Sequence, residues 1–281
     1  MSMFKKQESL SHMAQVTDIS QEHKIYLRQV RMEKISVRVI QLLIFGVALI
    51  LWEICANAKT VDPFITSQPS RVLKTIINLY QDGMLLNHIG ITCLEAVVGF
   101  VLGTLVGTII AILLWWSEFL CKVLEPYLVV LNSLPKIALG PVFIVWIGAG
   151  PAAIIVMTLA ISLIVTVLEV LNGFLTTDQE KIKLVRTFGG TKLQVLSKVL
   201  LPASYPTIIN ALKINVGLSW VGVIVGEFLV SKAGLGYLIV YGGQVFKLDL
   251  VMTSVIILGV AATVMYQGVV YLERILVKNK F

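Results

Sequence analysis

Residues 177–206 read TDQEKIKLVRTFGGTKLQVLSKVLLPASYP and form a polar segment between long apolar stretches. The first four residues fit a capping box, in which Thr177 caps a helix and Glu180 reaches back to it. Apolar residues then recur at helical spacing on both sides of Gly189-Gly190, which predicts two amphipathic helices joined by a glycine turn. Pro202 is expected to end the second helix. An ordered, two-faced hairpin in such a loop is either a surface on which another protein docks or an amphipathic loop that rests on the inner leaflet of the membrane.

The composition of the chain excludes a soluble globular protein. Of its 281 residues, 57% are hydrophobic and only 14% are charged. A water-soluble fold would expose too much of this apolar surface, so we expect a protein that crosses a membrane several times. The net charge of +7 does not require a nucleic-acid partner, because in a membrane protein the position of basic residues matters more than their sum. About 35 residues at the N-terminus contain no apolar run, so we expect no cleavable signal peptide.

Stretches with little or no charge predict about six transmembrane helices and therefore an all-α, multi-spanning fold. Residues 1–38 are expected to form a polar cytoplasmic tail, and residues 39–281 to form the transmembrane domain. Four of the predicted spans cover residues 39–56, 89–116, 207–230 and 250–276, and the second of these is interrupted only by Glu95.

The third and fourth predicted spans share one uncharged stretch, residues 137–168, which is too long for a single upright helix. Glycine and proline at residues 148–151 predict a tight turn between the two. The third span begins near Cys121, and prolines are expected to kink or break it, namely Pro126, Pro135 and Pro141.

Basic residues predict the orientation of the chain. Lysine and arginine are concentrated before the first span, between the fourth and fifth spans and after the sixth. The positive-inside rule therefore predicts that both termini and residues 177–206 lie in the cytoplasm, with the spans in the cell membrane.

Two further patterns leave alternatives open. Gly99, Gly103 and Gly107 recur every four residues on one helix face and predict the close approach of another helix, either within the chain or from a second subunit. Residues 69–80 predict a short helix with a proline near its start, which either lies on the bilayer surface or binds a partner.

The polar hairpin segment resembles the EAA loop of binding-protein-dependent ABC importer permeases. That loop contains EAA, three residues, Gly, nine residues, Ile, one residue and Leu-Pro. The spacing is complete here with Gly189, Val199 and Leu201-Pro202. The EAA positions themselves depart from the family pattern, since they hold Lys183, Leu184 and Val185.

The resemblance extends to the nitrate, sulfonate and taurine branch of that family. Residues 135–150, PKIALGPVFIVWIGAG, are similar to a stretch of that branch, although Glu95 stands where the branch often has arginine. Similar residues also follow the hairpin, namely Pro206, Lys213, Trp220, Glu227 and the GLG of residues 234–236.

The resemblance implies a type I importer permease. A second, identical copy would complete a central pathway, a cytoplasmic ABC ATPase would dock on the hairpin, and an extracytoplasmic binding protein would deliver a small solute such as nitrate, a sulfonate or taurine. It implies no enzyme activity in this chain, which fits the lack of a GxxxxGK[ST] phosphate loop in the sequence. The residues that it assigns to ATPase coupling are Lys183, Arg186, Gly189, Gly190, Val199, Leu201 and Pro202.

Polar residues within the apolar spans are candidates for lining such a pathway. Glu227, in the outer part of the fifth span, either faces the pathway or is a buried hydrogen-bonding group that holds helices together. The same two alternatives apply to the remaining candidates, which are Asn132, Ser133, Asn215, Ser219 and Trp220.

A stand-alone secondary carrier is the main alternative from another class. It would be expected to show inverted repeats and several intramembrane charges, of which the sequence shows few. A membrane-embedded enzyme would need a catalytic constellation, but two of the three histidines, His12 and His23, fall in the polar tail and His88 stands alone. We therefore predict no catalytic residue, no metal site and no cofactor.

Overall fold

The computed structural model describes residues 21–278, and this part of the chain consists of helices and connecting turns without a strand. Contacts divide the chain into two units, one ending at Pro63 and the other beginning at Phe64. The helical content of residues 21–278 confirms the all-α fold expected from the sequence.

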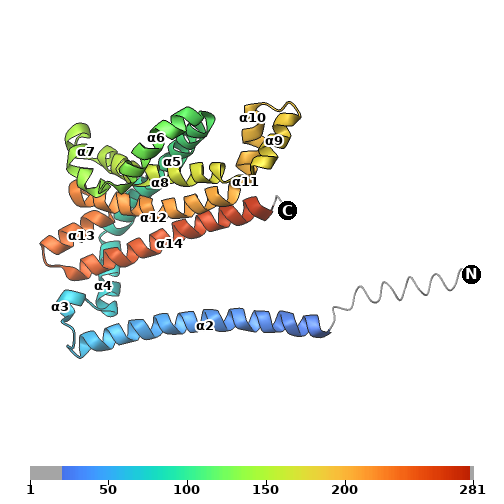
Figure 1. Cartoon of the computed structure of the whole chain (residues 1–281). Coiled ribbons are helices and arrows are strands. Elements are labelled where there is room, and N and C mark those ends of the chain that lie inside the picture. Colours follow the sequence, from blue (N-terminus) through green and yellow to red (C-terminus); the bar gives the residue numbers. More distant parts are fainter. Residues whose placement is uncertain (1–20, 279–281) are drawn as a thin grey trace, which may run out of the picture. The chain divides into compact units, whose positions relative to one another are not determined.

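The first unit contains the long helix α2 (Gln21–Asn57), drawn in blue in Figure 1. It includes the predicted span 39–56 and is long and apolar enough to cross a membrane. The helix begins well before residue 39, because residues 21–45 contain neither glycine nor proline to interrupt it. The part of the predicted tail at residues 1–20 lies outside the described residues, and the domain boundary at residue 38 stays a prediction.

The second unit contains the other predicted spans. Among the described residues, five helices could cross a membrane, or six if one bent pair counts as a single span. In this unit they are α5 (Met84–Trp116), α8 (Pro151–Leu175), α12 (Tyr205–Val230) and α14 (Leu248–Lys278), and the bent pair is α6 (Glu118–Ser133) with α7 (Gly140–Ile147). The prediction of about six spans is confirmed. The short helices α3 (Pro63–Thr66), α4 (Pro69–Gln81) and α13 (Leu235–Gln244) complete the set outside the hairpin.

The third predicted span is broken, as expected. Helices α6 and α7 meet at an angle of 86°, and the 3-10 turn η1 (Lys136–Leu139) follows Pro135 between them. Pro126 lies inside α6 and Pro141 in the first turn of α7, so only Pro135 coincides with the break. The predicted tight turn between α7 and α8 is also present, with Gly148 at a φ of 95° that favours glycine.

Helix α8 lies against both α5 and α12, and small residues make this approach close. A Cβ atom built on Gly103 of α5 would lie 2.6 Å from Ser162 Oγ, and one on Gly107 would lie 2.8 Å from Thr166 Cγ2. On the α12 side, a Cβ on Gly222 would lie 2.6 Å from the Cα atom of Thr158. The glycine face of α5 therefore serves packing within the chain, which decides between the two alternatives left open by the sequence.

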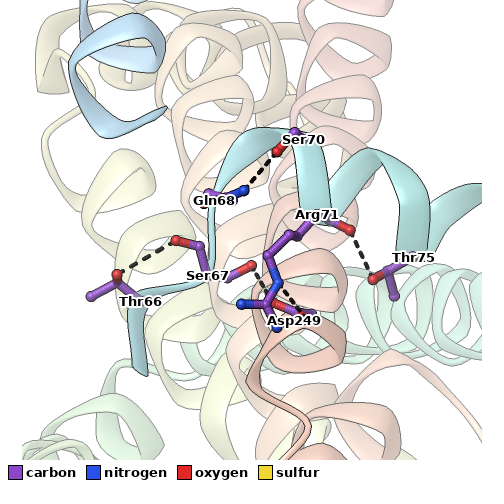
Figure 2. Close-up of polar contacts among 7 residues, drawn as sticks. All are labelled: Thr66, Ser67, Gln68, Ser70, Arg71, Thr75 and Asp249. Carbon is purple, nitrogen blue, oxygen red and sulfur yellow. Dashed lines mark hydrogen bonds and ion pairs between the residues drawn. The ribbon is translucent and has the colours of Figure 1, made fainter. Parts of the chain in front are cut away.

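Helix α4 is held against the beginning of α14 by an ion pair, shown in Figure 2. Arg71 Nη2 lies 2.6 Å from Asp249 Oδ2, and the Ser67 hydroxyl donates to Asp249 Oδ1 at 2.7 Å. An acidic residue in the first turn of α14 also suits the positive end of the helix dipole. Val72 is buried while Leu73 and Ile77 are exposed, so one edge of the predicted helix packs against the unit. Its position relative to a bilayer stays a prediction.

The close approach of α5 and α8 generates a testable prediction. Replacing Gly103 with valine places methyl groups where Ser162 already lies, and overpacking of this kind costs about 1–3 kcal/mol. We expect a lower thermal unfolding temperature of the purified protein in detergent. Gly259→Val on α14 is the control, since a Cβ there meets no atom of the described residues within 4 Å. Equal unfolding temperatures for the two variants would contradict the packing described.

Candidate functional site

The polar hairpin begins with helix α9 (Gln179–Thr187), whose cap differs from the one predicted. Asp178 caps the helix, and its carboxylate accepts a hydrogen bond from the Glu180 backbone N–H at 2.9 Å. Thr177 instead donates its hydroxyl to the Gly173 carbonyl at 3.0 Å, because α8 extends to Leu175 and Thr177 closes its last turn. The predicted capping box at residues 177–180 is therefore wrong.

The glycine turn after α9 is present as predicted. Gly189 has a φ of 76°, and its N–H bonds to the Arg186 carbonyl at 2.9 Å. The Gly190 N–H bonds to the Val185 carbonyl at 2.9 Å, which completes a Schellman motif. Only the first of the two glycines is left-handed, so Gly189 is the one whose backbone conformation the turn requires.

The second arm of the hairpin begins with a capping box that the sequence analysis missed. The Gln194 backbone N–H donates to Thr191 Oγ1 at 3.3 Å, and the Thr191 N–H donates to Gln194 Oε1 at 2.7 Å. These bonds begin helix α10 (Lys192–Val195). The signal was present in the sequence as TKLQ, a threonine followed three residues later by glutamine.

Pro202 does not end the second arm, contrary to the prediction. The chain continues through a π-helical turn (Leu196–Leu200) and α11 (Leu201–Ala203) into α12. The Leu201 N–H bonds to the Leu196 carbonyl, five residues back, and this wider turn directly precedes the proline. Pro202 then falls in the first turn of α11, where a missing N–H is tolerated. The second arm is therefore an almost continuous extension of span α12.

The hairpin shares an apolar core with the spans. Ile182 from α9, together with Val195, Leu196 and Leu200 from the second arm, is buried in one cluster with Phe174 of α8. The same cluster includes residues of α5, α6 and α12. Figure 1 shows α9 and α10 as a helical pair beyond the C-terminal end of α8. The hairpin is thus a structured part of the second unit rather than an independent loop.

Three apolar residues of the hairpin point outward rather than into its core. Phe188 is 83% exposed and Leu193 is 62% exposed, and Leu184 is exposed beside them in the hairpin. Phe188 occupies the C-cap position, where the chain leaves the helix, so the periodicity of α9 no longer directs its side chain to the core. We call Leu184, Phe188 and Leu193 the exposed apolar group of the hairpin.

Hydroxyl groups hold the two ends of the hairpin together at the end of α8. The Ser204 hydroxyl donates to the Gly173 carbonyl at 2.8 Å, and the buried Thr177 hydroxyl bonds to the same carbonyl. A Cβ on Gly173 would lie 3.1 Å from Thr207, so the small residue permits this approach. The chain therefore enters and leaves the hairpin at one fixed point.

Lys192 connects the hairpin to the end of span α5. Its ammonium group donates to the Trp116 carbonyl at 2.5 Å and lies 5.6 Å and 5.4 Å from the ring centroids of Trp115 and Trp116. A cation is favoured at the C-terminal end of a helix by the helix dipole, and it is also favoured over the faces of aromatic rings. Sequence reasoning missed this contact, because nothing local relates residue 192 to residue 116.

The predicted coupling residues fall into two groups. Lys183, Arg186, Gly189 and Pro202 are exposed, whereas Gly190, Val199 and Leu201 are partly buried against the hairpin's own core. The first group is accessible to a partner, and the second maintains the shape of the hairpin. Their role in coupling stays a prediction.

The predicted pathway residues do not form one group. Asn215, Ser219 and Trp220 are buried in the interior of α12, and the Asn215 amide donates to Thr104 Oγ1 of α5 at 2.7 Å. Asn132 and Ser133 are exposed at the end of α6, where their bonds go to Lys136 and Val129. The structure supports an interhelical role for Asn215, and the pathway role of the whole set stays a prediction.

Glu227 belongs to a buried polar cluster that joins α5, α12 and α13. The Thr92 hydroxyl donates to Glu227 Oε1 at 2.6 Å, and the Gly236 N–H donates to Oε2 at 2.5 Å. The carboxyl group thus lies at the N-terminal end of α13, where the helix dipole favours negative charge. A Cβ on Gly236 would lie 2.8 Å from Oε2. The absence of a side chain at Gly234 and Gly236 therefore leaves room for the Glu227 carboxyl group.

Further bonds extend this cluster to residues that the sequence analysis did not assign. The Leu235 N–H donates to Thr92 Oγ1 at 2.8 Å, and the Gly234 N–H donates to His88 Nδ1 at 2.9 Å. Every backbone N–H from Gly234 to Gly236 is therefore occupied by a side chain of α5 or α12. This arrangement supports the hydrogen-bonding alternative for Glu227, and the GLG sequence that begins seven residues after it was the available signal.

These features define a helical membrane protein with an ordered hairpin between two of its spans. The chain belongs to the family of binding-protein-dependent transport system inner membrane components, whose sequence model matches residues 103–279. It is thus an ABC importer permease, a multi-pass membrane protein of the class that the hairpin spacing predicted.

Relatives extend the similarity over most of the chain. It is 34% identical to an ABC transporter permease protein of Haemophilus influenzae, over 77% of this chain and 88% of that protein. It is 29% identical to an aliphatic sulfonates transport permease protein of Bacillus subtilis, over 84% and 86%. It is 27% identical to a formylaminopyrimidine transport permease protein of Halalkalibacterium halodurans, over 69% and 77%.

A solved structure supports the same fold. The MetNI methionine ABC transporter, in an inward-facing conformation, has a chain that matches 67% of this one with a TM-score of 0.53. The match covers 97% of that chain at 22% sequence identity, and at this identity it shows the fold alone. The type I importer permease fold expected from the resemblance is confirmed.

The Glu227 cluster generates a prediction about stability. Glu227→Ala removes the acceptor from Thr92 and Gly236, and unpaired buried groups of this kind cost about 1–3 kcal/mol each. We expect a clearly lower unfolding temperature in detergent, with faster hydrogen exchange at residues 234–236. Glu180→Ala on the exposed start of α9 is the control. An unchanged unfolding temperature would show that Glu227 does not hold these helices together.

Proposed function

We propose that this chain is the membrane-spanning subunit of an ATP-driven importer and that its hairpin docks on a cytoplasmic ABC ATPase. A second, identical copy would complete the translocation pathway, and an extracytoplasmic binding protein would deliver the solute. This chain would bind no nucleotide, and hydrolysis would belong to the ATPase. The observation that carries the proposal is the hairpin, which presents an exposed apolar group on a rigid support.

The rigid support has a physical basis. The two arms share buried side chains with the spans, and Gly173 fixes the place where both ends meet α8. Exposed apolar side chains that gather on such a support mark an interaction site, and aromatic residues such as Phe188 are enriched in protein interfaces. A displacement of the docked ATPase would therefore move α8 and α12 with the hairpin.

The charge distribution supports the proposed orientation. The hairpin carries a group of basic residues, namely Lys181, Lys183, Arg186, Lys192 and Lys198. By the positive-inside rule this end of the second unit lies in the cytoplasm, with both termini on the same side. The opposite end, where α4 meets α14, would then face the binding protein.

The named relatives support a small organic solute. One is named for aliphatic sulfonates and another for formylaminopyrimidine, which differ in charge and shape. The names of these relatives therefore indicate a small solute but do not identify its chemical class.

The docking role of the hairpin is testable with a surface variant. Phe188→Asp should leave the fold intact, because the side chain is 83% exposed, and should place a charge at the centre of the proposed interface. We expect loss of the ATPase when the permease is purified from its own cells in mild detergent. Tyr80→Asp, an exposed aromatic position on α4, is the matched control. Retention of the ATPase by the Phe188 variant would refute docking at this surface.

The contact between Lys192 and the two tryptophans generates a second functional prediction. Lys192→Gln should keep the ATPase bound, since the lysine is engaged with α5 rather than with the exposed apolar group. We expect transport per ATP hydrolysed to fall severalfold in proteoliposomes, because the hairpin would be joined less rigidly to the end of α5. Lys181→Gln on α9 serves as the control. Equal coupling ratios in both variants would exclude Lys192 as a connection between the hairpin and α5.

A further inference from the structure

A cavity of about 710 Å³ lies at the end of the second unit opposite the hairpin. It is bounded by the first turns of α5, the turn between α7 and α8, and the residues that follow α12. Its walls are mostly apolar, with Leu86 and Leu94 on one side and Ile154 and Ile155 on another. Sites of this volume and character are typical for small organic ligands.

Glu95 is the acidic residue of the cavity lining, and it is only 2% exposed. Its Oε2 atom has no hydrogen-bond partner within residues 21–278. A buried acceptor without a donor is costly, and more so inside a membrane span, where water does not supply the missing bond. The side chain therefore points to a donor that comes from outside the chain.

The neighbouring groups of the chain do not supply that donor. The Glu227 carboxyl group shares a hydrogen bond with Glu95, but this bond leaves Glu95 Oε2 without a partner. Lys232, the basic residue of the lining, is exposed. A hydrogen bond between two carboxyl groups requires a proton on one of them, so the pair carries one negative charge, which disfavours an anion and favours a cation or an N–H donor.

We propose that this cavity binds the transported solute and that Glu95 Oε2 accepts a hydrogen bond or ion pair from an amino group of that solute. The ligand is a small organic amine, whose nitrogen reaches Glu95 and whose carbon skeleton contacts the leucine and isoleucine walls. The inference rests on the proposed function and narrows its substrate class. A solute whose polar group is solely a sulfonate does not fit, because it brings an anion to an acidic floor.

The test uses the complete complex of permease and ATPase in nanodiscs and pairs of probes that differ only in the amino group. Taurine is paired with ethanesulfonate, and aminopyrimidine with pyrimidine, within a wider set of small amines and their deaminated analogues. We expect at least one amine, and none of the deaminated partners, to raise the unfolding temperature. The apparent affinity for that amine should fall about 10-fold to 100-fold in Glu95→Gln, since the loss of a hydrogen bond to a charged group weakens binding by about this factor.

A second variant keeps the test valid if Glu95→Gln folds poorly. Gly90 lines the cavity, and a Cβ there meets no atom of the described residues within 4 Å, so Gly90→Leu should fill the space without disturbing Glu95. We expect it to abolish the amine effect. Gly259→Leu on α14 is the matched control.

Three outcomes would overturn the inference. They are the absence of any amine-dependent shift, an equal shift in Glu95→Gln, and a shift caused by the deaminated sulfonates. The inference would also be overturned if no amine had an effect and a co-purified lipid were displaced by Gly90→Leu. That result would show that the cavity binds a lipid instead. Failure of the proposed function is distinguishable, because it would appear as failure of the ATPase to assemble with the permease.

Discussion

The close packing of α5 and α12 against α8 is the interaction on which the rest of the structure depends. Inside a bilayer, apolar side chains gain little by leaving lipid, so helices associate where small residues let their backbones approach. Gly99, Gly103 and Gly107 on one side and Gly222 and Gly226 on the other provide that approach. The hydroxyls of Thr158, Ser162 and Thr166 bond to carbonyls within α8 itself, so these three groups are not left unpaired at the contact. The three spans therefore behave as one packed body.

The hairpin is joined to this body in three different ways. The second arm continues into α12 through the π turn, Gly173 fixes both ends to α8, and Lys192 reaches the end of α5. A loop held by one connection would bend when a protein bound to it moved. A loop held to all three spans would instead transmit that movement to the spans. Of the three positions that depart from the EAA pattern, Lys183 and Leu184 are exposed and lie outside these connections, whereas Val185 packs against the core of the hairpin. The departure therefore changes mainly the exposed surface of the hairpin.

Sequence reasoning found most of the local signals, although it missed the TKLQ capping box, and it failed for contacts between distant residues. The glycine spacing, the left-handed Gly189 and the break at Pro135 all follow from the backbone preferences of a few neighbouring residues. The cap at Thr177 was wrong because the length of α8 decides which residue begins α9, and that length depends on burial of Phe174. Pro202 failed as a stop signal because a π turn relieves the clash that normally ends a helix. The contacts of Lys192 with Trp116 and of Glu227 with Thr92 join residues more than 70 positions apart, so no local pattern encodes them.

The two carboxyl groups at the end of the unit opposite the hairpin differ in whether the chain satisfies their hydrogen bonds. Both Glu95 and Glu227 are almost fully buried, and the sequence singled out only Glu227 for a pathway role. Yet Glu227 has its hydrogen bonds satisfied by Thr92 and the N-terminal end of α13, so it gains nothing from a ligand. Glu95 retains a free oxygen at a cavity and gains a bond whenever an N–H donor enters. A permease must release its solute, and one unsatisfied acceptor in an apolar cavity offers recognition without the multiple bonds that would retain the solute.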